Sequence, residues 1–222
     1  MTLPPLSLLE TRILGVLVEK QLTVPDTYPL TLNALVAGCN QKSSRDPVIE
    51  ASEAEVQAAV DRMKSLSLVV ESSGGRVMRY AHNVQRVLGV PSQAVALLAM
   101  LMLRGPQTAG ELRIHTDRLH RFSDISAVEA FLEELRERAD GALVQELPRQ
   151  AGARETRWTH LLSGAPPAAV PVAAGSESTG AAERVAVGEM AALRAAVDDL
   201  RTQLAAMRSD VDRLLSELGI SR

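Results

Sequence analysis

The stretch SEAEVQAAVDRMKSLSLVVESSGGRVMRYAH, residues 52–82, predicts a helix followed by a β-hairpin. Ser52 and Glu55 have the spacing of a capping box, in which a hydroxyl and a carboxylate satisfy free N–H groups at the start of a helix. Apolar residues then recur at helical spacing. Gly74-Gly75 permits a tight turn, so the short apolar stretches on either side of it are predicted to pair as two strands.

Two further helices are predicted before this stretch. Ser7 and Glu10 form another capping box, and residues 30–39 have the pattern of a second, shorter helix. Three helices followed by a hairpin is the order of a winged helix-turn-helix domain, whose third helix can enter the major groove of DNA. The first predicted domain therefore spans residues 1–88.

The same order of elements recurs after Pro91. Helices are predicted at residues 92–103, 109–115 and 126–138, and a second hairpin follows them. Thr31-Leu32-Asn33-Ala34-Leu35 is similar to Thr108-Ala109-Gly110-Glu111-Leu112, and Arg79-Tyr80-Ala81-His82 is similar to Arg157-Trp158-Thr159-His160. This similarity predicts a tandem repeat, with a second domain at residues 89–162. The expected fold class is α+β and helix-dominated, with two tandem winged helix-turn-helix domains and then a C-terminal coiled-coil helix.

The C-terminal part of the chain has two predicted segments. Residues 163–182 are rich in Ala, Pro and Gly, which is typical of a flexible linker. Residues 183–219 are predicted to form a coiled-coil helix, because apolar residues alternate at spacings of three and four. These residues are Met190, Leu193, Val197, Leu200, Leu204, Met207, Val211, Leu214 and Leu218. They predict a homodimer; packing of this helix on the globular part of its own chain is the alternative.

Composition excludes several classes of protein. The formal net charge is −3 and no region is markedly basic, so no broad basic field points to nucleic acid. Cys39 is the single cysteine, which excludes an intramolecular disulfide. The longest apolar run, residues 94–103, is half a membrane span and is expected to be a helix buried between the domains, or else a dimer surface. With no signal-peptide pattern at the start, the expected setting is cytoplasmic, without a membrane.

The sequence does not predict an enzyme. Its four histidines, His82, His115, His120 and His160, have no metal-ligand spacing with Cys39. No glycine-rich phosphate loop is present, and a distant cysteine and histidine are no better than chance as a nucleophilic pair. No catalytic residue, metal or cofactor is therefore predicted.

Basic side chains on loops and hairpins are the candidates for binding nucleic acid, because both third helices begin with carboxylates, such as Glu53 and Glu129, that phosphates would repel. The candidates are Gln41, Lys42, Arg45, Arg76, Arg79, Arg118, Arg121, Arg149, Arg154 and Arg157. Each one alone is better explained as a surface residue paired with a nearby carboxylate. Two hypotheses stay open: a DNA-associated, regulator-like dimer that grips the backbone, or a protein-interaction module that uses its acidic third helices.

Several short motifs together resemble the YceH-like family of bacterial proteins. They are Glu19-Lys20-Gln21, Tyr28-Pro29-Leu30, Cys39-Asn40-Gln41-Lys42-Ser43, Arg45-Asp46-Pro47-Val48, Leu103-Arg104-Gly105-Pro106-Gln107-Thr108 and Gly110-Glu111-Leu112-Arg113. The resemblance covers roughly residues 6–162. It implies tandem winged-helix domains and a bacterial cytoplasmic setting, but no activity. Within these motifs, Cys39 is expected to be a buried apolar residue, and Asn40 to end the second helix in a left-handed conformation.

Overall fold

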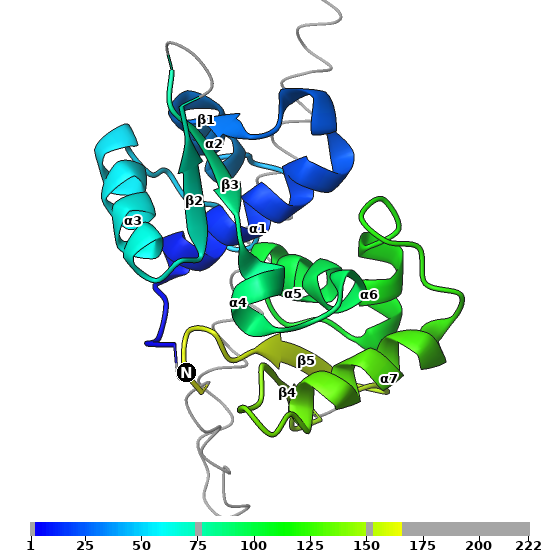
Figure 1. The fold of residues 1–222 in the computed structure, drawn as a ribbon. Coiled ribbons are helices and arrows are strands. Elements are labelled where there is room, and N and C mark those ends of the chain that lie inside the picture. The colour runs from blue at the N-terminus through cyan, green and yellow to red at the C-terminus, as the bar shows by residue number, and fades with distance from the viewer. Residues whose placement is uncertain (1–2, 74–76, 150–152, 166–222) are drawn as a thin grey trace, which may run out of the picture. The chain divides into compact units, whose positions relative to one another are not determined.

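The computed structural model describes residues 3–73, 77–149 and 153–165 (Figure 1). The predicted coiled-coil helix, most of the predicted linker and the candidate residue Arg76 lie outside the described residues. The described part is helix-rich and of mixed α+β class, with small antiparallel sheets. The described residues belong to one compact unit.

Three helices form the first half of this unit, residues 1–88. They are α1 (Leu8–Thr23), α2 (Leu32–Cys39) and α3 (Glu53–Ser65), with a short 3-10 turn η1 (Pro25–Thr27) after α1. Each begins at a side-chain cap, because a hydroxyl of Ser7, Thr31 or Ser52 accepts a backbone N–H three residues on. The capping boxes predicted with Glu10 and Glu55 are both present.

The first half also contains a three-stranded antiparallel sheet, in the order β1-β3-β2. Its strands are β1 (Leu30–Thr31), β2 (Val69–Ser72) and β3 (Arg79–His82). The prediction of one helix over residues 30–39 is wrong at its start, because the first two residues pair with β3 and the helix begins afterwards. A short helix, α4 (Val84–Leu88), follows the hairpin and was not predicted.

The second half repeats this plan down to the strand register. It contains α5 (Ser92–Arg104), α6 (Ala109–His115), α7 (Ile125–Arg136), β4 (Val144–Leu147) and β5 (Arg157–His160). Tyr80 of β3 lies opposite Leu30 and Glu71. Trp158 of β5 lies in the same way opposite Gln107 and Glu146. The single bridge at Gln107 therefore takes the place of β1.

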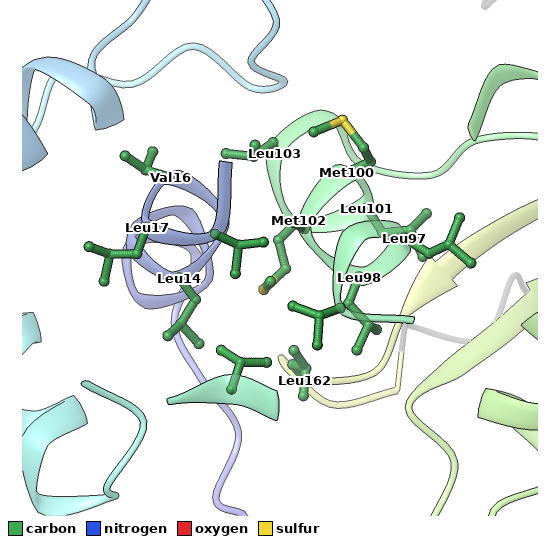
Figure 2. Close-up of a cluster of buried hydrophobic side chains, with 14 of the residues drawn as sticks. Leu14, Val16, Leu17, Leu97, Leu98, Met100, Leu101, Met102, Leu103 and Leu162 are labelled. Atoms are coloured by element: carbon green, nitrogen blue, oxygen red, sulfur yellow. The ribbon is translucent and has the colours of Figure 1, made fainter. Parts of the chain in front are cut away.

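Helices α1 and α5 join the two halves through a layer of aliphatic side chains (Figure 2). Every residue from 94 to 103 is buried, which confirms that this apolar run is a buried helix. Leu14 of α1 and Leu98 and Met102 of α5 are among the side chains of this layer (Figure 2). Each fully buried side chain of this kind stabilises the fold by about 1.5–3 kcal/mol relative to exposure.

Candidate functional site

The exposed surface of α3 is acidic. Glu53 and Glu55 are exposed in its first turn, and hydrogen bonds from Ser52 lower the pKa of Glu55, so this carboxylate is charged. The two basic residues near its end are both neutralised by ion pairs. Arg62 pairs with Glu10, and Lys64 pairs with Glu71 of β2. The candidate groove-reading helix of the first half therefore presents carboxylates and no unpaired cation.

Helix α7 repeats this arrangement in the second half. Arg136 pairs with Glu133 at 2.6 Å and approaches Glu146 of β4 at 3.7 Å. Its guanidinium also lies 5.9 Å from the centroid of the Trp158 ring. Glu129 is exposed on the same helix. The basic residue of α7 is therefore occupied within the protein, as are those of α3.

The arginines of the two hairpins share one structural role. Arg79 donates to the carbonyl oxygen of Pro29 at 2.8 Å, and Arg157 donates to that of Pro106 at 3.0 Å. Arg157 also forms an ion pair with Glu111 at 3.2 Å. Both side chains stay exposed, but some of their N–H groups donate to the turn before β1 in the first half and before the equivalent bridge in the second half. This shared role explains why the sequence repeats arginine at these positions.

Arg45, a candidate for nucleic-acid binding, is a buried residue, which is a correction to the sequence-based expectation. Its side chain is 1% exposed and pairs with Glu19 at 2.5 Å. It also donates to the carbonyl oxygens of Gly38 and Ser44. The physical reason is that the loop after α2 folds back over α1, so the guanidinium satisfies the loop's carbonyls. Lys42, in the same loop, remains exposed.

Arg12 is a second buried guanidinium, and the sequence analysis missed it. It is 0% exposed and donates to the carbonyl oxygens of Cys39 at 3.3 Å and Pro47 at 2.6 Å. Burial, together with neighbouring Arg45, lowers its pKa. Among the described residues no carboxylate forms an ion pair with Arg12, and its Nε has no partner. Arg12 lies four residues before Val16 and seven residues before Glu19 on α1, which places it on the same face of the helix. This spacing was the signal in the sequence that could have indicated its burial.

The Cys39-Asn40 segment is structural. Cys39 is fully buried, as predicted, and burial raises the pKa of its thiol to about 12. Asn40 ends α2, but its φ of −86° is not left-handed, which corrects the expected backbone conformation. Its side-chain amide instead bonds both the N–H and the carbonyl of Ala51, each at 2.8 Å. Gln41 accepts from Arg45 and donates to Ser43 within the same loop.

The remaining candidates lie in the second half. Arg121 pairs with Asp117 at 3.2 Å on the surface, and Arg118 is exposed. Arg149 and Arg154 both line a groove of about 500 Å³ between α7 and the second hairpin, and four glutamates line it too. The groove is therefore mixed in charge and does not form a basic surface.

A polar cluster that was not predicted links the two halves. Arg104 at the end of α5 donates to Ser44 Oγ at 2.8 Å and lies 3.2 Å from Nε2 of His115. Nδ1 of His115 lies 2.6 Å from Oε1 of Gln107, whose amide donates to the carbonyl oxygen of Met100. Because Arg104 only donates, His115 is neutral with its proton on Nδ1. Burial and Arg104 lower the pKa of His115, in keeping with this state.

His82 and His160 occupy equivalent places at the ends of β3 and β5. Burial lowers the pKa of each to about 4. Nε2 of His82 lies 2.5 Å from Oε1 of Gln21, whereas Nδ1 of His160 is buried with no partner among the described residues. Both side chains are therefore neutral and structural at neutral pH.

We expect this pair to make the protein sensitive to acid. The folded-state pKa values, about 4, lie below the unfolded value of about 6.5. The stability that the neutral rings contribute is therefore present above pH 6.5 and is lost as the pH falls toward 4. Between pH 6.5 and 5 the expected loss is on the order of 2 kcal/mol per histidine. Urea denaturation across this range measures it, and His82→Gln/His160→Gln should flatten the profile; an equally steep profile contradicts the assignment.

The part of the chain that the structure describes contains neither a metal-binding cluster nor a membrane-spanning helix. No group of three or more His, Cys, Asp and Glu side chains is arranged there to hold a metal ion. No helix among residues 3–73, 77–149 and 153–165 combines the length and the apolar composition needed to span a bilayer.

Comparison with known proteins identifies close relatives. Residues 6–153 match the family model described as "Protein of unknown function, DUF480". A UPF0502 protein of Dechloromonas aromatica is 61% identical, over 93% of this chain and 94% of its own length. A UPF0502 protein of Leptothrix cholodnii is 58% identical, over 96% of this chain and 95% of its own. These matches extend beyond the two repeated halves into the C-terminal part of the chain.

Proposed function

Because the chain belongs to the DUF480 family, whose description assigns no activity, we propose its function from its surface: a non-enzymatic tandem winged-helix protein that binds a partner protein. In this proposal the acidic third helices, α3 and α7, form the contact surface. The setting is the cytoplasm, and the chain acts as a dimer. No cofactor is needed for this role.

The winged-helix part of the proposal is supported by the order of the elements. Three helices precede an antiparallel hairpin in the first half, and the same order recurs in the second. The third helix lies against the hairpin in each half. In this arrangement the third helix is the element that contacts DNA in DNA-binding members, and the hairpin is the wing.

One observation carries the choice of a protein partner over DNA. The basic residues of α3 and α7 are held in ion pairs, while Glu53 and Glu55 at the start of α3 and Glu129 on α7 are exposed and form no ion pair among the described residues. A helix that enters the major groove passes close to phosphates, which repel unpaired carboxylates. A protein partner that carries basic residues would instead be attracted to them.

The dimer part of the proposal is supported by the heptad pattern of residues 190–218. Two copies joined through this segment would present four third helices to a partner. Binding of several weak sites at once raises the overall affinity without any new contact. A dimer therefore suits a module whose individual acidic surfaces are small.

The DNA hypothesis remains the second candidate, because Lys42, Arg118, Arg149 and Arg154 are exposed. Fluorescence anisotropy of the purified chain with random-sequence duplex DNA across a salt series separates the two. We expect no binding even at low salt. Binding that weakens steeply with salt would mean that several phosphates are neutralised, and this result would overturn the proposal in favour of DNA.

The acidic helices are tested directly by photo-crosslinking in cells. A photoreactive amino acid at Ala58 or Ala130 lies on the exposed part of α3 or α7, and Ala37 on α2 provides an exposed control position. We expect discrete protein adducts from the third-helix positions. Reversing charge with Glu53→Lys and Glu55→Lys should abolish those from α3. Equal adducts from Ala37, or adducts that survive charge reversal, would contradict this surface as the site of contact.

A further inference from the structure

An apolar surface marks the corner between α6 and α7. Ile114 is 69% exposed and Ile125 is 45% exposed, the former being the most exposed large apolar side chain in the described part of the chain. Gly110 connects them, because it lies one helical turn before Ile114 and a Cβ on it would lie 3.9 Å from Cδ1 of Ile125. We call these three residues the isoleucine corner.

The first half shows that the fold does not require this corner. When the sequences are aligned at the N-caps of α2 and α6, Thr31 with Thr108, Ala37 corresponds to Ile114 and Asn33 to Gly110. Aligned at the N-caps of α3 and α7, Glu53 corresponds to Ile125. The repeat thus carries small or polar residues at the equivalent positions. Exposed isoleucines at only one of two equivalent sites indicate a contact specific to the second half.

The charges around the corner are balanced. Arg113 directly precedes Ile114, Arg118 follows it by four residues, and both arginines are exposed. Glu129 follows Ile125 by one turn of α7, and a Cβ on Gly110 would lie 3.9 Å from Oε2 of Glu155. A purely acidic or purely basic partner would meet repulsion on one side of such a surface. A surface with an apolar centre and both signs of charge at its rim can instead complement itself across a two-fold axis.

We propose that the isoleucine corner is covered by the same corner of a second copy of this chain. This inference does not depend on the partner protein proposed above, but it rests on the dimer of the proposed function. Two isoleucines per copy are far too few for a free-standing interface, which buries about 1,200 Å² or more. The proposed coiled coil removes this difficulty, because joining two copies through a short linker, such as the one predicted for residues 163–182, would hold the second copy at an effective concentration in the millimolar range. A weak, self-complementary contact is then sufficient.

Disulfide cross-linking of the full-length chain tests the proposal with matched controls. Cysteines are introduced singly as Ile114→Cys, Ile125→Cys, Ala37→Cys and Glu53→Cys, the last two at the equivalent exposed positions of the first half. Cys39 gives no background, because it is fully buried and its pKa is raised. Under mild oxidation we expect covalent dimers from at least one second-half variant, formed about tenfold faster than from either first-half variant.

Every outcome of this experiment decides something. Equal rates from all four positions would mean that the copies are merely near each other, and this would overturn the proposal. A monomeric mass by light scattering would also overturn it. Full alkylation of Ile114→Cys and Ile125→Cys in the purified dimer would show an uncovered corner and leave a different protein as its occupant. Loss of the rapid cross-link of Ile125→Cys when Ile114→Arg is added would support the second copy, since the arginines would then face each other.

Discussion

Replacing Glu19 by alanine is expected to lower the free energy of unfolding by about 3–5 kcal/mol, because it leaves a buried charge without its partner. Glu19 is the carboxylate that pairs with Arg45, whose side chain is 1% exposed. Arg12 lies nearby, and burial together with the charge of Arg45 lowers its pKa. Without Glu19, two buried cations would face each other with only backbone carbonyls and the side-chain oxygen of Gln41 as acceptors. The loop that carries Lys42 should lose its order with the rest of this cluster.

Urea denaturation of the full-length chain measures this cost. Asp117→Ala is the matched control, because it removes a carboxylate from an exposed pair with Arg121, where about 0.2–1 kcal/mol is expected. The double variant Glu19→Leu/Arg45→Met replaces the pair by apolar groups and should recover most of the loss, since it leaves no uncompensated charge of this pair. A Glu19→Ala variant as stable as Asp117→Ala would mean that solvent reaches Arg45.

The repeated architecture could be predicted because its signals are local. The capping boxes at Ser7 and Ser52 involve residues three apart, and the structure has both. The similarity of the segments around Tyr80 and Trp158 also proved informative, because these residues occupy the same place in the strand register. Local chemistry decides these features, so one sequence was sufficient.

Features that depend on distant parts of the chain were missed. Residues 30 and 31 form a strand and not the start of a helix, because β3, about fifty residues later, offers its free edge. Arg12 and Arg45 look like surface residues in the sequence. The loop between α2 and α3, which carries Arg45, nevertheless folds back over Arg12, and both guanidinium groups become buried. Helix propensity and charge alone cannot indicate which carbonyls will need a donor.

The same limit applied to the candidate surface. The carboxylates of the third helices were visible in the sequence, at Glu53 in the first turn of α3 and at Glu129 on α7. The neutralisation of Arg62 was not, because its partner Glu10 is 52 residues away. Arg136 has a local partner in Glu133, but its approach to Glu146, on a strand that follows the helix, was not visible either. The sequence therefore identified the carboxylates of these helices but not the ion pairs that neutralise their basic residues. These ion pairs are what favours a protein partner.

Replacing Gly15 by valine is expected to destabilise the protein by about 3 kcal/mol, because it forces α1 and α5 apart. A Cβ at Gly15 would lie 2.7 Å from Cγ and 2.9 Å from Cδ2 of Leu103, and 3.4 Å from the carbonyl oxygen of Ala99. Leu103 is fully buried, so its side chain has no free space to move into. The helices that join the two halves meet at this contact, and strain here should reduce the cooperativity with which both halves unfold.

A matched pair of alanine variants separates this clash from the backbone effect of losing a glycine. Gly110 also lies inside a helix, but a Cβ there would have no neighbour nearer than 3.8 Å. Gly110→Ala should therefore stabilise the chain by up to about 1 kcal/mol through helix propensity. Gly15→Ala has the same gain in helix propensity, but overpacking lowers its free energy of unfolding by more than this gain. Adding Leu103→Ala to Gly15→Val should cost less than the sum of the two single changes, since the cavity accommodates the new methyl groups. Strict additivity would mean that α1 and α5 already tolerate a wider separation, and the close contact at Gly15 would then not be what fixes the two halves together.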